Sequence, residues 1–148
     1  MATIDKSVTR ELVSLDAGDS SREAARRMAQ KNIGSVAVRE GLRTVGLVTE
    51  RDLVIRLLAR GAPTDVPVRE IMRLDLPFVT PATSDAECTA LMREHGTRHL
   101  LVRESGEVVG VISMRDLLRL MLAEREWLIG QLQTFIDGRD GPRQPPTP

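Results

Sequence analysis

Apolar residues switch between helical and strand-like spacing twice along the chain. After Ser20 and again after Ser84, apolar residues recur at helical spacing, and a Glu follows each Ser by three residues. This Ser-x-x-Glu spacing is typical of a capping box, in which side chains satisfy the free N–H groups at the start of a helix. The pattern predicts one helix beginning at each serine, with its apolar face turned inward.

Two short apolar runs follow each predicted helix. They are residues 33–38 and 44–49 in the first half and residues 99–102 and 108–113 in the second, each pair separated by a polar, turn-like stretch. Such runs predict two β-hairpins. A helical pattern resumes after Thr49 and after Ser113, and a short strand is predicted before each first helix, near 14–15 and 78–79. Each half therefore has the order strand, helix, strand, strand, helix.

The two halves are copies of one another at an offset of 64 residues. "GLVTERDL" at 46–53 matches "GVISMRDL" at 110–117, and further matches extend back to Ser20 and Ser84 without a gap. A repeat of this length indicates a duplicated structural unit. A second similarity, between "VTRELV" at 8–13 and "PVREIM" at 67–72, has an offset of 59. It predicts five additional residues near 73–77 in the second copy.

The repeat predicts an α+β fold with four parts. Residues 1–62 form the first unit and 63–122 the second, while 123–137 extend the last helix. Residues 138–148 have too little apolar content to fold and are expected to be a disordered tail.

Composition narrows the possible functions. The chain has 21 basic and 21 acidic residues, so its net charge gives no bulk attraction for nucleic acid or for an anionic membrane. No apolar run approaches the roughly 18 residues that cross a bilayer, and the first residues lack the apolar core of a signal peptide, so a cytoplasmic location is expected. Cys88 is the only cysteine, which excludes an intramolecular disulfide and a cysteine-based zinc site.

A catalytic constellation is not visible in the sequence. His95 and His99 have a spacing used by metal sites, but they are predicted to span a helix end and a strand, which loses the i,i+4 geometry. We therefore expect a protein that is not an enzyme and requires no cofactor. A metal-dependent enzyme is the third alternative.

The repeated Thr/Ser-x-x-Asp stretch is the strongest candidate for ligand chemistry. Thr49 and Ser113 lie where a strand passes into a helix, so the N–H groups and the positive helix end can receive a phosphate. Asp52 and Asp116 follow one turn later, where a carboxylate can accept hydrogen bonds from ribose hydroxyls. The alternative is that both stretches only cap helices, and the two roles are compatible.

These repeated motifs, together with "NIGSVAV" in the first copy and "TRHLLV" in the second, resemble a tandem pair of cystathionine-β-synthase (CBS) domains. The resemblance covers roughly residues 8–122. It implies two β-α-β-β-α units related by a pseudo-twofold axis, often called a Bateman module, with adenine nucleotides bound in clefts between the units. It also implies association into disc-like dimers.

The resemblance and the motif together nominate further binding residues. Arg51 and Arg115 can balance phosphate charge. In the family, basic residues in the middle strand reach the phosphates, so the resemblance implies that Arg98 and His99 do so here. The first copy has Gly34 in the position of Arg98. We therefore predict two unequal sites, with the dominant one in the second copy. Exposed strand residues or packing residues are the alternatives. The adenine slot and the ribose contact are assigned to Val36, Leu100, Ile112, Thr80 and Ala82, of which the first three are also candidates for ordinary core positions.

The last helix, predicted from Leu117 to about Ile136, carries apolar residues on more than one face. A monomer does not normally leave that much apolar surface exposed, so a second surface should cover it. Packing across a homodimer and docking to a client protein both remain open.

The sequence thus predicts a regulatory protein that binds AMP, ADP or ATP and changes conformation or assembly to control a partner. S-adenosylmethionine, a dinucleotide cofactor or a cyclic dinucleotide remains open as the ligand. The alternative is a ligand-free dimeric scaffold that recruits a partner through its C-terminal helix.

Overall fold

The computed structural model describes residues 2–136. The predicted tail at 138–148 lies outside the described residues. The elements in chain order are η1 (Asp5–Ser7), β1 (Ser14–Asp16), α1 (Ser21–Lys31), β2 (Ser35–Glu40), β3 (Arg43–Thr49), α2 (Glu50–Asp52), η2 (Leu53–Leu58), η3 (Val68–Glu70), α3 (Asp85–His95), β4 (His99–Glu104), β5 (Glu107–Ser113) and α4 (Met114–Ile136).

Both first helices begin at the predicted serines. The hydroxyl of Ser20 accepts the N–H of Glu23 at 3.1 Å, and Ser84 accepts that of Glu87 at 3.2 Å. Each helix ends in a left-handed residue, Asn32 in α1 and Gly96 in α3, which satisfies the last carbonyls. The local sequence therefore sets both ends of these helices.

The hairpins pair as the repeat predicts. β1 lies parallel to β2, and β2 pairs antiparallel with β3, in a sheet of order β1-β2-β3. β4 pairs antiparallel with β5, and an isolated parallel bridge between Val79 and Val102 stands where the first unit has β1. The mixed helix and strand architecture confirms the predicted α+β fold with a long C-terminal helix.

The segments that precede the two units are exchanged between them. Thr9, which precedes β1 in the first unit, pairs with Val111 of the second through two backbone hydrogen bonds of 2.9 and 3.0 Å. Arg73, ahead of the second unit, pairs with Leu47 of the first. Both pairs keep the 64-residue offset, so the expected five-residue insertion near 73–77 is wrong. The similarity at an offset of 59 is a coincidence of composition that the backbone pairing does not follow.

Each unit has its own core, and the exchanged segments complete both. Val68 and Ile71 are buried in the first core, and Ile4 is buried in the second. The hairpins are buried on both faces: one face joins its own core, while Leu47 and Leu101 are buried outside either core and line a small cavity between the units. The second face therefore holds the two units together.

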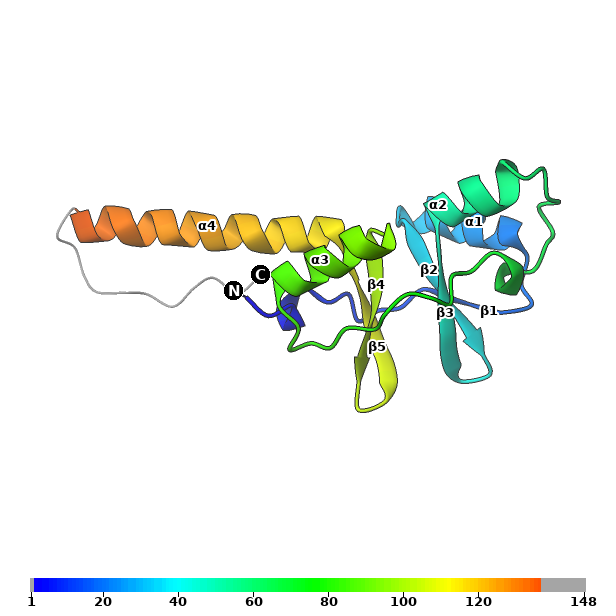
Figure 1. The fold of residues 1–148 in the computed structure, drawn as a ribbon, viewed down its shortest axis with the longest axis horizontal. Coiled ribbons are helices and arrows are strands. Elements are labelled where there is room, and N and C mark those ends of the chain that lie inside the picture. Colours follow the sequence, from blue (N-terminus) through cyan, green and yellow to red (C-terminus); the bar gives the residue numbers. More distant parts are fainter. Residues whose placement is uncertain (1, 137–148) are drawn as a thin grey trace.

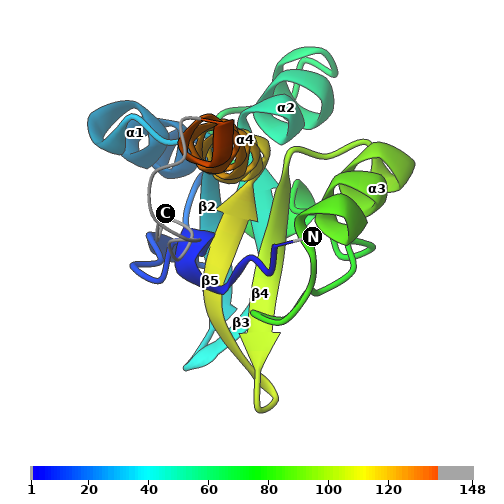
Figure 2. The same ribbon diagram turned by 90° about the vertical axis from the view of Figure 1, so that its left-hand side faces the viewer.

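The helices lie on one side of the molecule and the hairpin turns on the other (Figure 1). α4 starts at the top of β5 and projects well beyond the body, with α3 beside its base. α1 and α2 lie toward the other end of the molecule, behind the base of α4 in the view of Figure 2. Within residues 2–136, no helix has the length and apolar character needed to span a membrane.

Candidate functional site

Both Thr/Ser-x-x-Asp stretches form reciprocal helix caps. In the first unit, Oδ2 of Asp52 accepts the N–H and the hydroxyl of Thr49 at 2.8 and 3.0 Å. In the second, Oδ2 of Asp116 accepts the N–H and the hydroxyl of Ser113 at 2.9 and 2.6 Å. The amides of both aspartates bond back to the Thr or Ser oxygen. The capping interpretation is therefore confirmed in both copies.

The caps leave the two aspartates unequally available. Asp52 is only 5% exposed, and its Oδ1 lies 3.7 Å from Nε of Arg56. Asp116 is half-buried, and its hydrogen bonds to the described residues all use Oδ2. Oδ1 of Asp116 can therefore accept hydrogen bonds from a ligand while the cap stays intact.

The start of α4 offers one backbone donor beside this carboxylate. The amide of Met114 donates to the carbonyl of Arg98 at 2.8 Å, and that of Asp116 donates to Ser113. Met114, Arg115 and Asp116 carry the first three amides of α4. Among the described residues, the amide of Arg115 is the one of these three that remains available to bind an anion. The positive end of a helix with 23 residues faces the same point.

His99 lies where the two units meet. A methyl group built on Gly34 would lie 3.1 Å from Cε1 of His99 and 3.3 Å from Oε1 of Glu50. Burial lowers the pKa of His99 below its ordinary value, while the carboxylate of Glu50 opposes that shift. We name the surroundings of this ring the junction. Besides Glu50, the junction contains Asp116, which also raises the pKa of His99, and two arginines that lower it, Arg98 and Arg115.

Four predicted residues, Arg98, His99, Arg115 and Asp116, are thus brought together at the junction. Glu50 joins them from the other unit, and the sequence reasoning missed it. Its one signal was its position directly after Thr49, opposite Met114 in the second copy.

The other nominated residues lie elsewhere. Val79 pairs in parallel with Val102, so the chain runs from there to Thr80 and Ala82, away from His99 and toward the hairpin turn. Three side chains assigned to the adenine slot are at most 1% exposed and lie in the unit cores: Val36, Leu100 and Ile112. Contact of these five residues with a ligand stays a prediction. Arg51 follows Glu50 on the exposed start of α2.

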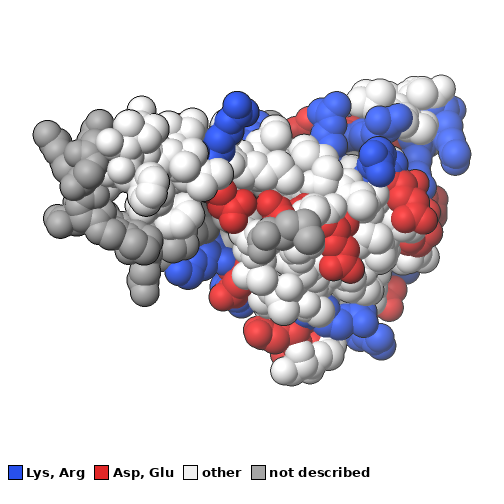
Figure 3. Space-filling view, turned by 60° about the vertical axis from the view of Figure 1, so that its left-hand side comes forward, with Lys and Arg blue, Asp and Glu red and all other residues white. Residues whose placement is uncertain are grey.

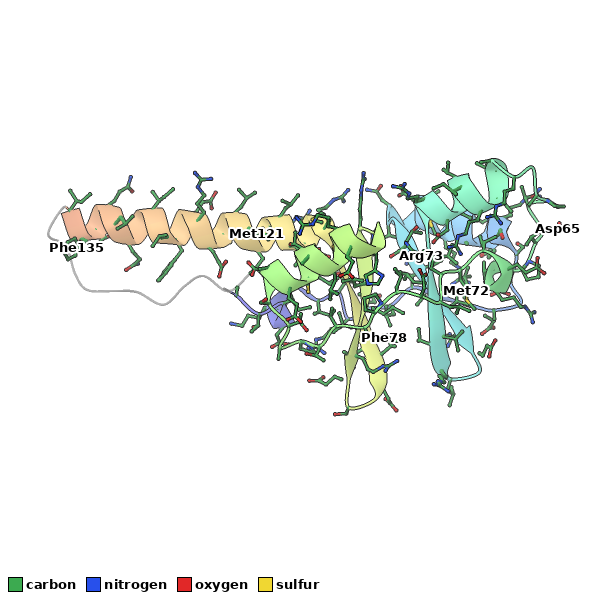
Figure 4. The ribbon with its side chains drawn as sticks, viewed as in Figure 1. Asp65, Met72, Arg73, Phe78, Met121 and Phe135 are labelled. Atoms are coloured by element: carbon green, nitrogen blue, oxygen red, sulfur yellow. The ribbon has the colours of Figure 1, made fainter. Side chains whose placement is uncertain are left out.

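The space between the units is small in this structure. A cavity of about 50 Å³ lies between β3, β4 and the chain from Arg73 to Phe78. Figure 4 labels both ends of this chain segment, with Met72 directly before it. A nucleotide site normally needs several hundred Å³. This cavity by itself is therefore too small for a nucleotide. The sequence reasoning did not single out this cavity, although Gly46, one of its lining residues, belongs to the repeated motif.

A second hollow, of about 520 Å³, is lined by Ser20, Arg22, Pro63, Thr64 and Asp65. Figure 4 shows Asp65 at the end of the molecule opposite the tip of α4, and the side chain of Arg22 already donates to Thr64 at 2.7 Å. The hollow therefore does not extend the junction. Among the described residues, no group of three His, Cys, Asp or Glu side chains could hold a metal ion.

Comparisons with known proteins agree with this architecture. The family model described as "CBS domain" matches residues 4–59 and 68–123. A CBS domain-containing protein of Bacillus subtilis, YhcV, is 29% identical over 79% of this chain and 84% of its own length.

Solved structures give the same picture. A putative signal-transduction protein with CBS domains from Burkholderia ambifaria has a TM-score of 0.74 and 35% identity, covering 78% of this chain and 86% of that one. A CBS domain protein from Pyrobaculum aerophilum, complexed with AMP, has a TM-score of 0.68 and 30% identity, covering 78% of this chain and 89% of that one. The chain belongs to the CBS-domain family, as a tandem pair of CBS domains.

Proposed function

We propose that the protein binds an adenine nucleotide at the junction and acts as a regulatory module rather than as an enzyme. CBS-pair proteins are generally regulatory or binding modules. The observation that carries the proposal is the carboxylate of Asp116: Oδ2 fixes its position through the cap, and Oδ1 is left to accept ribose hydroxyls. The Pyrobaculum relative in complex with AMP supports this ligand class.

The charges around Asp116 suit a phosphate group. The amide of Arg115 and the positive end of α4 provide a backbone site for an anion, and the side chains of Arg98 and Arg115 add positive charge. AMP, ADP and ATP are the proposed ligands. S-adenosylmethionine shares the adenosine but lacks phosphates, so it would use Asp116 and could pair with the arginines only through its carboxylate.

The proposed regulation follows from the position of the site between the units. Asp116 and Arg98 belong to the second unit, whereas Gly34 and Glu50 belong to the first. A ligand that binds one relative arrangement of the units more tightly than another shifts the population toward it. A partner that contacts the units would sense that shift. We propose a cytoplasmic location, where adenine nucleotides are available.

Calorimetric titration with AMP, ADP, ATP and S-adenosylmethionine tests the binding proposal. The variant Asp116→Asn keeps an amide oxygen for the cap but loses the carboxylate, so it should fold and bind AMP at least about tenfold more weakly. Asp52→Asn is the matched control in the buried, arginine-paired copy and should change AMP affinity little. Folded wild-type protein that binds none of the four ligands would contradict the proposal.

We also propose that the protein forms a homodimer through the outer faces of η2 and α4. Ten of the thirteen large apolar side chains exposed in the described residues lie on these two elements. Val54 and Leu58 of η2 occupy the positions that Leu118 and Leu122 occupy in α4, so the pseudo-twofold axis repeats the apolar surface. Beyond Glu126, α4 carries no charged residue, and Figure 3 shows its outer part as mostly uncharged.

A second copy fits this surface in charge as well as in apolarity. Arg51 and Arg60 flank the exposed side chains of η2, and the stretch Glu124–Glu126, which is net negative although it includes Arg125, precedes those of the outer part of α4. Arg51, Arg60, Glu124 and Glu126 make no ion pair within the described residues. A dimer in which each α4 crosses η2 of its partner would bring the opposite charges together and cover both apolar faces.

Sedimentation measurements test the dimer. Leu132 on α4 is 54% exposed, and Leu132→Glu should raise the dimer dissociation constant by about tenfold or more because a charge would enter the apolar contact. Leu42, fully exposed in the turn between β2 and β3, provides the control variant Leu42→Glu. A wild-type monomer at high micromolar concentration would overturn the dimer and favour a client protein as the occupant.

A further inference from the structure

The junction contains one charge that the repeat does not duplicate. Glu50 is the first residue of α2, and its amide donates to the carbonyl of Gly34 at 3.0 Å. The equivalent residue at the start of α4 is Met114, whose amide donates to Arg98 in the same way at 2.8 Å. The two helix starts therefore have the same backbone geometry and differ by one carboxylate.

That carboxylate points toward the residues proposed to bind phosphate. Oε1 of Glu50 and the ring of His99 both approach the open side of Gly34, at 3.3 and 3.1 Å from a methyl group built there. Glycine at this position leaves room for both side chains to approach it, one from each unit. Any larger residue at 34 would push them apart.

The charge around His99 is consequently balanced. Glu50 and Asp116 place two negative charges near the ring, and Arg98 and Arg115 place two positive charges near it. Burial holds His99 in its neutral form, so the ring adds no positive charge near neutral pH. Without Glu50, the same group would carry one net positive charge.

We propose that Glu50 limits how much phosphate charge the site accepts, so that it weakens the binding of ADP, and still more of ATP, relative to AMP. This inference rests on the proposed nucleotide binding. Each added phosphate extends the negative charge of the ligand toward a junction that already contains an unrepeated carboxylate. Repulsion therefore increases along the series, while the ribose contact with Asp116 is the same for all three ligands.

The size of the effect follows from Coulomb's law. One elementary charge about 8 Å away, at an effective dielectric constant of about 30, changes an affinity roughly tenfold. Glu50 is exposed, so solvent and salt reduce this to between about three- and tenfold. Its removal should therefore strengthen ATP binding by that factor and AMP binding by less.

Titration of wild-type protein and Glu50→Gln with AMP, ADP and ATP, without divalent cations and at low salt, tests the proposal. The amide keeps the shape of the side chain and removes its charge. Glu40→Gln, an exposed glutamate at the far end of β2, is the matched control. The expected result is a ratio of ATP to AMP affinity that rises in Glu50→Gln and stays unchanged in Glu40→Gln.

The possible failures are distinguishable. If wild-type protein binds AMP and the ratio of AMP to ATP affinity is the same in Glu50→Gln, the role of Glu50 is wrong and nucleotide binding stands. If neither protein binds any adenine nucleotide, both proposals fall. An NMR titration of the His99 ring gives a readout without ligand: the pKa of His99 should decrease further in Glu50→Gln, and an unchanged value would overturn the inference.

Discussion

The glycine of the repeated motif lets the exchanged segments approach the hairpins, and Gly110→Ala tests this directly. A methyl group at Gly110 would lie 2.5 Å from Cγ1 of Val8 and 2.6 Å from the carbonyl oxygen of Thr9. The second of these atoms belongs to the backbone, so the segment itself must move away from β5. We expect Gly110→Ala to weaken or break the two hydrogen bonds that join Thr9 to Val111.

The magnitude can be worked from those contacts. Overpacking of a buried site destabilises a protein by about 1–3 kcal/mol. Partial loss of two backbone hydrogen bonds adds about 1 kcal/mol, at the low end of the usual range for each bond. A decrease of about 3 kcal/mol in the free energy of unfolding corresponds to a decrease of about 6–12 °C in Tm for a chain of this size.

The chain contains its own control at the equivalent glycine. A methyl group at Gly46 would lie 2.8 Å from Sδ of Met72, the end of a flexible side chain, and 3.4 Å from the carbonyl oxygen of Arg73. Met72 can rotate away, so Gly46→Ala should lower the unfolding free energy by only about 1 kcal/mol. Chemical denaturation of both variants decides the matter. Equal losses, or a larger loss for Gly46→Ala, would refute the reasoning from backbone approach.

Two further predictions concern titratable side chains. The pKa of His99 is lowered by burial, so the unfolded chain binds a proton that the folded chain does not, and stability should fall as pH decreases below about 6.5. His99→Gln should reduce that loss, measured by denaturation at about pH 7.5 and 5.5, with His95→Gln as the control. Burial raises the pKa of the Cys88 thiol to about 11, so maleimide should label native protein far more slowly than unfolded protein. Equal labelling rates would contradict the buried position.

Much of the local architecture could be predicted because it depends on residues close together in the sequence. The Ser-x-x-Glu and Thr/Ser-x-x-Asp spacings place caps within one helical turn, and all four caps form where they were expected. Apolar runs separated by a few turn residues can hardly pair in another way, so both hairpins were also foreseeable. The 64-residue repeat then indicated that the two units share one fold.

Half of the candidate site could also be predicted from residues close together in the sequence. Asp116 and Ser113 belong to a local motif, and the difference between Gly34 and Arg98 was visible when the copies were aligned. The contribution of Glu50 was not visible. It depends on the approach of Glu50 and His99 to the same side of Gly34 across the unit boundary, between residues far apart in the sequence.

The tertiary structure decided which segments complete each unit and which face of a hairpin meets its own helices. The sequence could not do so, because the strands are apolar on both faces and alternation alone does not separate the core face from the contact face. The misleading offset of 59 rested on one shared Arg-Glu pair with apolar neighbours, a similarity too short to identify equivalent segments, and only their pairing partners distinguish them. Thr9 and Arg73 have those partners in the opposite unit. Local chemistry therefore determined the elements, and packing between distant segments determined the site.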